Sequence, residues 1–409
     1  MACSILRNHQ MGVNYLSEAV RRKVKRIALF RRDLAYRWVT KRRQFGSPSG
    51  HAPRRFATDL TAYSAANPET AKWISVESPT FLRRMAPGGS SAIQQHFSPY
   101  LEQKLPEEGV MRFKNARILG GYAGAVVASD ETLIVPFSTD PFGMGRHRSS
   151  ARLKLPKIHD LIGRTAFLAT PEADCNYYHF TVDLLPRLLL LERALGSLAS
   201  LDHLVLNLRN KAYEEPLLRR FGLPLDKVLH LEDDMHLRVE ELYVPTFTPS
   251  EYGVAAWKTS GIRSKVLKHE SKRPAGTKLF LSRKGASSRR LLNEDELFQV
   301  LQKHGFVAMD CGAHSLEEQV SIFSSATHVV GLHGAAFTNI IYCQPGTRIY
   351  EMINALSLRG FYWSLSDVCG LHHKFITTKP ACQSAGLESH RANKTDAEVE
   401  IDQLTQAFD

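Results

Sequence analysis

The chain lacks the short patterns that mark several common classes of protein. None of its six cysteines forms a Cys-x-x-Cys pair, so neither a zinc knuckle nor a disulfide framework is indicated, and we expect reduced thiols. It has no G-x-x-x-x-G-K-[ST] loop of the P-loop nucleotidases and no G-x-S-x-G elbow. A metal-binding Asp-x-Asp pair is absent too, because Asp233 and Asp234 are adjacent and are expected to cap a turn. We therefore expect no metal ion and no other cofactor.

Long apolar runs are also missing. No stretch approaches the roughly 18 apolar residues that a membrane span needs, since Pro186 and Arg187 interrupt the longest cluster, Leu184 to Leu191. The first twenty residues have no continuous apolar core, so they do not read as a secretory signal. We expect a cytoplasmic protein that is soluble or bound to one membrane face.

Positive charge is concentrated near the N-terminus. The formal net charge is +12, and residues 21–43 hold eleven Lys or Arg and a single acid. Four apolar residues recur there at helical spacing: Ile27, Phe30, Leu34 and Trp38. This pattern predicts a basic amphipathic helix that lies on the inner face of an anionic membrane, with a solvated basic tail as the alternative. No aromatic stacking motif or nucleic-acid module accompanies it, so we expect no nucleic-acid partner.

The 409 residues suit two domains with tails. Residues 46–100 are rich in Ser, Pro, Gly and Ala, which predicts that 1–100 is the basic segment followed by a linker. Strand and helix patterns then fall into two series, at 101–268 and 269–380, followed by a tail at 381–409. In the first series, 177–195 has helical periodicity and Pro186 forces a start or kink near its middle.

The second series alternates five strands with short helices over about a hundred residues. The expected strands are TKLFLS, FVAMD, THVVG, GTRIYEM and HHKFITT, and the expected helices are 293–305, 315–326 and 358–370. Asn293 is expected to cap the first helix, and Ser315 with Glu318 forms a capping box for the second. The alternation predicts an α/β fold with a doubly wound parallel sheet.

The stretch VVGLHGAAFTN at 329–339 is the first candidate site. Ligands of a doubly wound sheet bind beyond the carboxyl ends of its strands. Gly331 is expected to end the strand, Gly334 to allow close backbone approach, and the N–H groups near Ala335 to meet an anion at the helix start. His333 would donate a hydrogen bond to a phosphate oxygen, or it is a histidine buried in a turn. Asn339 completes this candidate set.

Other polar residues follow neighbouring strands. Arg283 comes directly after TKLFLS, so it should reach the same edge of the sheet, and a guanidinium suits a diphosphate. Arg289 and Arg290 follow in the same loop, and at least one of them is expected to be a surface residue. Glu351, near the end of another strand, could accept hydrogen bonds from ribose hydroxyls.

The first series contributes NYYHFTVDLLPRL. His179 and Asp183 are four residues apart and share a face of a helix. An imidazole and a carboxylate at this spacing can act as a general base and its orienting partner. The alternatives are a metal site, for which no third ligand is evident, and a polar pair on a helix surface.

Several of these segments together resemble glycosyltransferase family 61, and most closely its bacterial members that are labelled capsular-polysaccharide biosynthesis proteins. The resemblance covers roughly 165–352 and rests on NYYHFTVDLLPRL, on SRK followed by RLLNEDEL, on the segment LEEQVSIFSSATHVVGLHGAAFTNIIYCQPG, and on IYEM. The chain departs from many relatives at Lys284, where they have a second Arg, and at Ala336, where they have Gly.

The resemblance implies a GT-B architecture, in which two Rossmann-like domains face each other across a cleft. It also implies inverting, metal-independent transfer of a sugar from a nucleotide sugar, expected to be UDP-linked, to a hydroxyl of a glycan or polysaccharide acceptor. Arg283 and His333 would then neutralise the leaving diphosphate, and Asp183 or His179 would take the acceptor's proton. A non-catalytic protein that binds nucleotide sugars is the alternative on the same fold. A glycoside hydrolase is a further rival, although no carboxylate pair is placed by the sequence.

Overall fold

A computed structural model describes residues 53, 55–138, 147, 155–269, 276–286, 288–380 and 395–408. The basic segment at 21–43 and residues 381–394 of the expected tail lie outside this part of the chain, so the predicted membrane contact stays a prediction. Among the described residues, no helix combines the length and the apolar character that crossing a membrane requires.

The described strands form two large sheets and one two-stranded sheet, which confirms the α/β class. The first sheet has nine strands in the described part of the chain. They are β1 (Arg55–Ala57), β2 (Ala71–Glu77), β5 (Glu108–Leu119), β6 (Ala125–Val127), β7 (Thr132–Ile134), β8 (His159–Phe167), β9 (His203–Leu206), β10 (Val228–His230) and β11 (His236–Pro245). Its helices are α3 (Leu60–Ala66), α5 (Leu185–Leu195), α6 (Glu214–Arg220) and α7 (Ala256–Val266).

This first sheet is mixed. β11, β8, β9 and β10 run parallel to one another, whereas the long β5 pairs antiparallel with β2, β6 and β11. Antiparallel neighbours need no crossover helix, so only the β8–β11 part has the character of the predicted Rossmann-like domain. The predicted GT-B arrangement and the domain boundaries therefore remain predictions.

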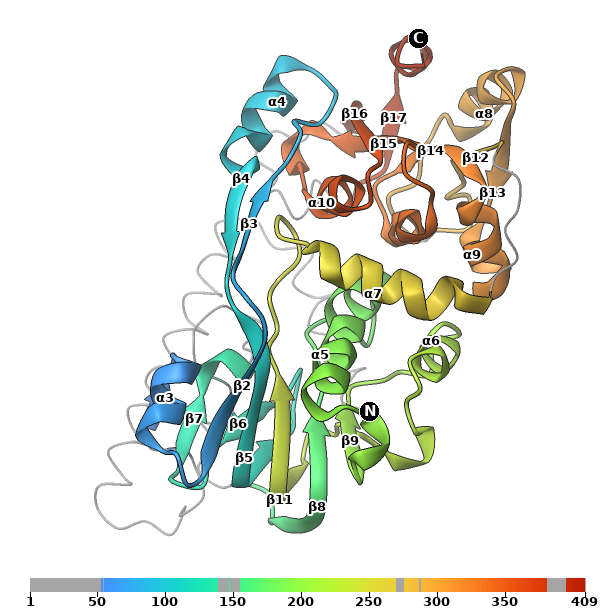
Figure 1. Cartoon of the computed structure of the whole chain (residues 1–409). Coiled ribbons are helices and arrows are strands. Elements are labelled where there is room, and N and C mark those ends of the chain that lie inside the picture. The colour runs from blue at the N-terminus through green and yellow to red at the C-terminus, as the bar shows by residue number, and fades with distance from the viewer. Residues whose placement is uncertain are drawn as a thin grey trace, which may run out of the picture.

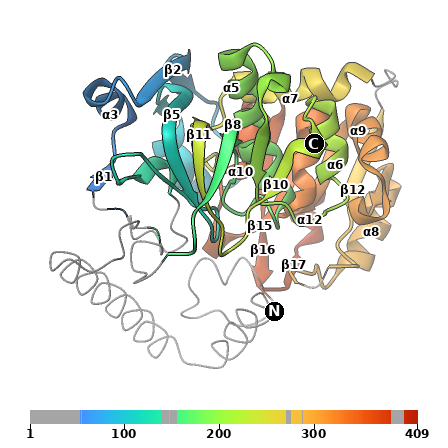
Figure 2. The ribbon, with the colours of Figure 1, turned by 90° about the horizontal axis from the view of Figure 1, so that it is seen from below.

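The second sheet follows the predicted alternation. Its strands are β12 (Thr277–Leu281), β13 (Phe306–Met309), β14 (Ala326–Leu332), β15 (Arg348–Asn354), β16 (His372–Pro380) and β17 (Ala397–Val399). Its helices are α8 (Glu294–Lys303), α9 (Leu316–Ser324), the 3₁₀ helix η9 (Ala335–Tyr342), α10 (Phe361–Val368) and α12 (Ile401–Thr405). The order is β13-β12-β14-β15-β16-β17, parallel except for β17. Seen from below, α8 and α9 lie on the side of the molecule away from α3 and β1 (Figure 2).

One of the two helix N-terminal caps expected from the sequence is present. The Ser315–Glu318 capping box of α9 is present, with both of its reciprocal hydrogen bonds. Asn293 does not cap α8 through its side chain, because its amide group instead bonds both backbone groups of Val399 in β17. A tertiary contact with β17 therefore uses the polar side chain that the local sequence pattern assigns to the helix N-terminus.

The described residues of the linker predicted at 46–100 form helices and strands, and the later ones build an arm. Strand β3 (Thr80–Arg83), helix α4 (Ser91–Phe97) and strand β4 (Glu102–Leu105) extend from the first sheet to lie beside the second (Figure 1). Gly88 exchanges backbone hydrogen bonds with His373 and Phe375 of β16, at 2.8 and 2.9 Å. The Gly- and Pro-rich composition that reads as a linker thus allows the backbone of the arm to approach β16 closely.

Aromatic packing fastens the arm to the second sheet. Phe97 is fully buried, and its ring lies 5.0 Å from the rings of both Trp363 and Phe375. The Trp363 indole donates to the carbonyl of Met85 at 3.2 Å. Because these contacts join residues far apart in the sequence, the arm holds the two halves of the chain together.

The helix predicted at 177–195 begins as a π-helix. Residues His179–Leu184 form a π-helical turn, and the α-helix α5 starts at Leu185 with Pro186 in its first turn. Proline is tolerated there because the first N–H groups of a helix have no partner within it. The change of helix type at Leu185, next to Pro186, confirms the predicted break.

We expect Phe97→Ala to lower the free energy of unfolding by about 3–5 kcal/mol, as buried Phe truncations do. Phe81→Ala in the same arm is the control, because Phe81 is 55% exposed and should change stability by less than about 0.5 kcal/mol. Urea denaturation measures both. Equal midpoints for Phe97→Ala and wild type would show that the arm does not hold the halves together.

Candidate functional site

The strand order of the second sheet defines where a ligand can bind. After β12 the chain moves to β13 on one side and then returns to β14 on the other, which makes β12 and β14 the neighbours at the topological switch point. Their carboxyl ends lie level, since Leu281 pairs with Gly331. The residues that leave this edge are Arg283 after β12 and His333 after β14, as the sequence predicts.

Arg283 lies directly over the glycine of the loop. A Cβ atom at Gly334 would lie far inside van der Waals contact with Nη1 of Arg283, so glycine is what allows the guanidinium to occupy this place. The guanidinium donates to the carbonyls of Arg289 and Ser288 at 2.8 and 2.9 Å. The backbone N–H of Arg283 donates to the buried Glu294 carboxylate at 3.1 Å, which anchors the loop to the first turn of α8.

A second guanidinium, that of Arg289, stands beside the first. Arg289 has a left-handed backbone with φ of 56° and donates to the carbonyl of His333 at 3.2 Å. Burial lowers the pKa of both arginines, and the charge of Arg289 lowers that of Arg283 further. Arg290 is a surface residue that pairs with Asp396 at 2.7 Å. As expected, one of the two loop arginines is therefore a surface residue.

No ion pair to a carboxylate is found for Arg283 or Arg289 among the described residues. Two partly buried guanidinium groups side by side repel each other unless an anion lies between or beside them. The first turn of η9 starts at the same place, and N–H groups of a first turn have no acceptor within their own helix. The arrangement therefore fits an anion with several oxygen atoms, such as a phosphate.

His333 is buried rather than presented at the surface. Its side chain is 8% exposed, and its Nδ1 atom makes a short hydrogen bond with Oε1 of Glu351. Burial, followed by the charges of Arg289 and Arg283, lowers the pKa of His333 to about 3. The ring is therefore neutral at physiological pH, and because Nδ1 is engaged by Glu351, Nε2 is the ring nitrogen that could meet an anion.

The expected ribose contact of Glu351 does not fit the structure. Glu351 is completely buried, and its two carboxyl oxygens face His333 and His373. A carboxyl group with no exposed surface cannot accept hydrogen bonds from a sugar bound at the edge of the sheet. The sequence placed it correctly near the end of a strand, but the side chain points into the interior.

The structure also places the three remaining candidate residues of the stretch 329–339. Gly331 does not end its strand, because β14 continues to Leu332, and a Cβ there would press on Leu281 at 2.9 Å. Ala335 is the first residue of η9. Asn339 is completely buried and bonds Tyr177 at 2.9 Å and Gln319 at 2.7 Å, so its amide group joins the two halves and does not face a ligand.

The His179–Asp183 pair exists as predicted. Nδ1 of His179 lies 2.6 Å from Oδ2 of Asp183, and the other carboxylate oxygen accepts the Ser250 hydroxyl at 2.6 Å. The Asp183 side chain is 2% exposed. Both of its oxygens are engaged, so Asp183 orients the imidazole, and His179 is the member of the pair that can meet a substrate.

A second carboxylate holds the outer nitrogen of His179. Oε2 of Glu172 lies 3.3 Å from Nε2, and the Glu172 side chain is 56% exposed. Burial disfavours the charged ring, but the hydrogen bonds to Asp183 and Glu172 outweigh it and raise the pKa of His179 to about 9. In this structure the imidazole is therefore protonated at neutral pH. Glu172 has a φ of 60°, an uncommon conformation that accompanies functional sites.

The buried Arg187 connects the strand ends from which the loops with Glu172 and Ser250 start. It is buried, and its guanidinium donates to backbone carbonyls at the carboxyl ends of β8 and β11: Phe167, Leu168, Ala169 and Pro245. Burial lowers its pKa to about 9. The loop with Glu172 follows β8 and the loop with Ser250 follows β11, so Arg187 ties together the two strand ends that supply them.

Aromatic contacts bring the two clusters together. The rings of Tyr178 and His179 lie 5.0 and 5.8 Å from Phe361 at the start of α10. The next residue, Tyr362, lies 5.1 Å from the His333 ring and 5.6 Å from Tyr178. The carboxylate cluster of the first half and the arginines of the second therefore lie on either side of the same two aromatic residues.

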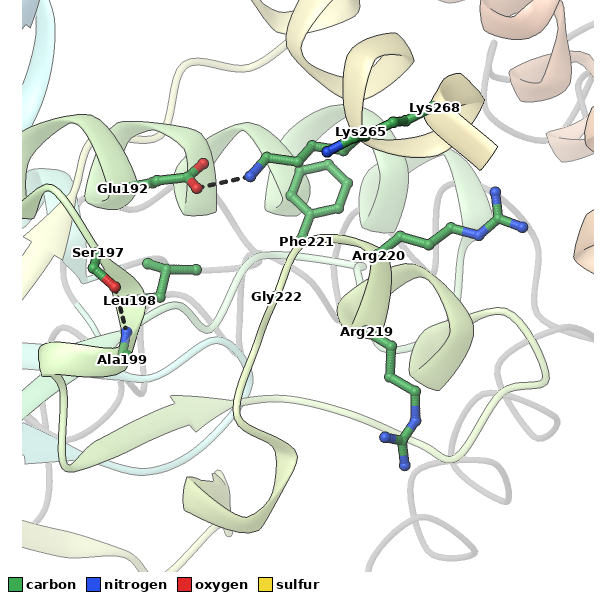
Figure 3. A pocket seen from close by; sticks show the side chains of 10 residues that line it. All are labelled: Glu192, Ser197, Leu198, Ala199, Arg219, Arg220, Phe221, Gly222, Lys265 and Lys268. Atoms are coloured by element: carbon green, nitrogen blue, oxygen red, sulfur yellow. Dashed lines mark hydrogen bonds and ion pairs between the residues drawn. The ribbon is translucent and has the colours of Figure 1, made fainter. Parts of the chain in front are cut away.

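A hollow of about 270 Å³ lies elsewhere, among α5, α6 and the end of α7 (Figure 3). Its basic lining residues are Arg219, Arg220, Lys265 and Lys268. Three of them are already paired: Lys265 with Glu192 at 2.7 Å, Arg219 with Glu215 at 2.6 Å and Arg220 with Glu317 at 3.0 Å. Its positive charge is largely compensated, in contrast to that of Arg283 and Arg289.

Sequence reasoning did not identify Glu172, Ser250 or His373. Glu172 and Ser250 both follow strands of the first sheet, so the rule that sites lie beyond carboxyl ends could have singled them out. Nothing in the local pattern marks His373, because its role depends on the neighbouring strand. In the described part of the chain, no group of three or more His, Cys, Asp or Glu side chains is arranged to hold a metal ion.

The raised pKa of His179 predicts a pH-dependent stability difference between wild type and His179→Asn. The charged ring stabilises the fold fully below its ordinary pKa of 6.5, and this contribution is lost as pH rises through about 9. We expect wild type to exceed the variant by about 3 kcal/mol more at pH 6 than at pH 10. Urea denaturation across this range measures it, and a constant difference would contradict the assigned protonation.

The comparisons with known proteins concern the stretch that carries most of this site. Residues 177–350, with Asp183, Arg283 and His333, match the model of the family Glycosyltransferase 61. A beta-1,2-xylosyltransferase of Arabidopsis thaliana is 32% identical over 104 residues, which are 22% of this chain and 19% of that protein. The chain thus spans about a fifth of the length of this curated relative. The segment that joins the His179 cluster to the arginine loop is therefore similar to the glycosyltransferase 61 family.

Proposed function

We propose that the protein is a glycosyltransferase that moves a sugar from a nucleotide sugar, UDP-linked, to a hydroxyl group of a glycan or polysaccharide. The observation that carries this proposal is the pair of guanidinium groups at the switch point, Arg283 and Arg289, without carboxylate partners among the described residues. A diphosphate is an anion of matching geometry for guanidinium forks. The match of 177–350 to the glycosyltransferase 61 family supports the same reading.

The proposed cleft lies between the carboxyl edges of the two sheets. β8 and β11 of the first sheet lead to Glu172 and Ser250, and β12 and β14 of the second lead to Arg283 and His333. A GT-B arrangement places donor and acceptor in such a cleft. We extend the proposal to this architecture, and to polysaccharide synthesis at the inner membrane face by a bacterial-type member.

The donor half of the reaction is electrostatic. When the bond between the anomeric carbon and the diphosphate breaks, negative charge accumulates on the leaving phosphate. Arg283 and Arg289 would neutralise it, and the neutral His333 would add a hydrogen bond. A metal ion supplies the same neutralisation in other transferases, so this reading predicts transfer without one.

The acceptor half uses His179. The acceptor hydroxyl would approach from the first half of the chain, opposite the diphosphate, which leads to inversion at the anomeric carbon. On entering, it would replace Glu172 at Nε2, and the partly exposed Glu172 carboxylate would carry the Nε2 proton away to solvent, which leaves Nε2 as an acceptor. His179 would then take the hydroxyl proton as oxygen attacks, with Asp183 holding Nδ1.

The first test is nucleotide binding without metal. We expect UDP to bind in EDTA, and Arg283→Ala to weaken its affinity by about 2 kcal/mol, roughly 30-fold, because a charge-assisted contact is lost. Gly334→Ala should weaken it roughly tenfold or more, since its methyl displaces the guanidinium. Calorimetric titration measures both.

Gly285→Ala is the matched control in the same loop. A Cβ at Gly285 meets only a carboxylate oxygen of Asp310 at an ordinary 3.7 Å, so UDP affinity should not change. Loss of binding in EDTA would overturn the metal-free reading. Full affinity in both Arg283→Ala and Gly334→Ala would remove this loop from the donor site.

The second test is turnover. UDP release from UDP-GlcNAc, UDP-xylose or UDP-arabinose identifies a transferase, whereas a binding protein is stabilised by the nucleotide and releases nothing. With an active donor, Asp183→Asn should lower kcat about 100-fold or more, the usual scale for general-base catalysis, while UDP affinity stays unchanged. Normal turnover in both Asp183→Asn and His179→Asn would place the base elsewhere.

A further inference from the structure

A chain of buried polar side chains crosses three neighbouring strands behind the arginine loop. His333 leaves β14, Glu351 belongs to β15 and His373 to β16. Nδ1 of His333 bonds Oε1 of Glu351, whose Oε2 lies 3.1 Å from Nε2 of His373 in a contact too misaligned for a good hydrogen bond. Nδ1 of His373 lies 2.9 Å from the Ser366 hydroxyl. The proposed function uses only His333, at the outer end of this chain.

The carboxyl group of Glu351 faces two imidazoles and no Lys or Arg side chain among the described residues. Its side chain is completely buried, and the imidazoles of His333 and His373 are its only ion-pair partners among the described residues. An isolated buried carboxylate is costly, so such a group either protonates or pairs with a cation. Burial raises the pKa of Glu351, and this effect is larger than the opposite effect of the neighbouring His373.

His333 is a poor candidate for that cation. Arg283, Arg289 and Arg359 lie close enough to lower its pKa, and only the charge of Glu251 acts in the opposite sense among these neighbours. A positive charge on the His333 ring would be repelled by the guanidinium groups of Arg283 and Arg289, which have no carboxylate partner among the described residues. The pair is therefore best described as a neutral carboxyl group and a neutral imidazole that share one short hydrogen bond.

The neutral pair fixes which ring nitrogen carries the proton. A neutral imidazole has one N–H donor and one acceptor nitrogen. A protonated carboxyl group donates to Nδ1, which makes Nδ1 the acceptor and leaves the proton on Nε2. An ionised carboxylate would have the opposite effect, placing the proton on Nδ1 and turning a lone pair toward the anion site.

We propose that Glu351 is a positioning residue that sets the tautomer of His333, so that its Nε2–H group points at the leaving phosphate as a hydrogen-bond donor. The role rests on the proposed function, because it concerns the leaving group of that reaction. Glu351 touches neither substrate nor phosphate and acts only through His333. The His373 ring, which Ser366 bonds, lies against the far side of the carboxyl group, and all three groups are buried where bulk water cannot supply a competing partner.

The tautomer can be measured without any substrate. Protein labelled with ¹⁵N at histidine distinguishes a protonated from an unprotonated ring nitrogen by chemical shift, and His333→Asn identifies the signals of this ring. We expect the wild-type protein at pH 7 to show Nε2 protonated and Nδ1 unprotonated. A protonated Nδ1 would overturn the proposal, whatever the enzyme's activity.

Two substitutions then test the consequence for turnover. Glu351→Gln offers an amide N–H to Nδ1 in place of the carboxyl O–H, so it should keep the tautomer and change kcat less than about threefold. Glu351→Leu removes the partner and should lower kcat roughly tenfold or more through the weakened donor, with a smaller effect on KM. Equal loss of kcat in both variants would show that the ionised carboxylate is what matters.

Met352→Leu is the matched control for disturbance of β15. Met352 is buried beside Glu351 in the same strand, and a volume-conserving change there should leave kcat unchanged. If Glu351→Leu fails to fold, the spectrum of Glu351→Gln still decides the tautomer. If no UDP-sugar is turned over by wild type, the proposed function fails, while the histidine spectrum judges this inference separately.

Discussion

Two guanidinium groups without a carboxylate partner in the described part of the chain are the constraint around which the site is arranged. Arg283 and Arg289 stand beside each other at the edge of the second sheet, partly withdrawn from water. The fold accepts this repulsion because carbonyl groups of the loop hold the Arg283 guanidinium and because Gly334 leaves room for it. An anion would relieve the repulsion, so the cost of building the site becomes binding energy when a ligand arrives. Burial, together with these two arginines, keeps the His333 ring neutral.

The two halves of the molecule contribute charges of opposite sign. Glu172 and Ser250 lie in the loops after β8 and β11, and Asp183 lies in the π-helical turn His179–Leu184, whereas the two arginines lie in the loop after β12. Their relative placement depends on contacts away from the chemistry. The arm from β3 to β4 packs on β16, and Arg263 of α7 donates to the carbonyls of Ile341 and Cys343 at the end of η9. Aromatic rings of Phe361 and Tyr362 fill the space between the clusters, so each cluster stays within reach of the other.

Much of the second half could be read from the sequence, for identifiable reasons. Parallel strands between short helices are buried on both faces, so THVVG and GTRIYEM stand out as apolar runs between turn residues. The Ser315 capping box is a local interaction and needs no tertiary context. Arg283 and His333 could be placed because a residue just past a parallel strand must emerge at the carboxyl edge. The first half was less predictable, since β2 pairs with β5 some forty residues away. The arm has the composition of a linker, and its structure depends on contacts with β16, which are distant in the sequence.

The sequence by itself determined which residues leave which strand, and it brought His179 and Asp183 onto one helical face through their spacing of four. It could not determine which way a side chain turns or what it meets. Asn339 and Glu351 were reasonable ligands by position, yet both turn inward, because Tyr177 and Gln319 satisfy the first and two histidines the second. Protonation was likewise decided by the tertiary structure. The pKa of His179 rises between two carboxylates and that of His333 falls when burial and arginines surround it, because desolvation and nearby charge are properties of a three-dimensional environment and not of a local sequence.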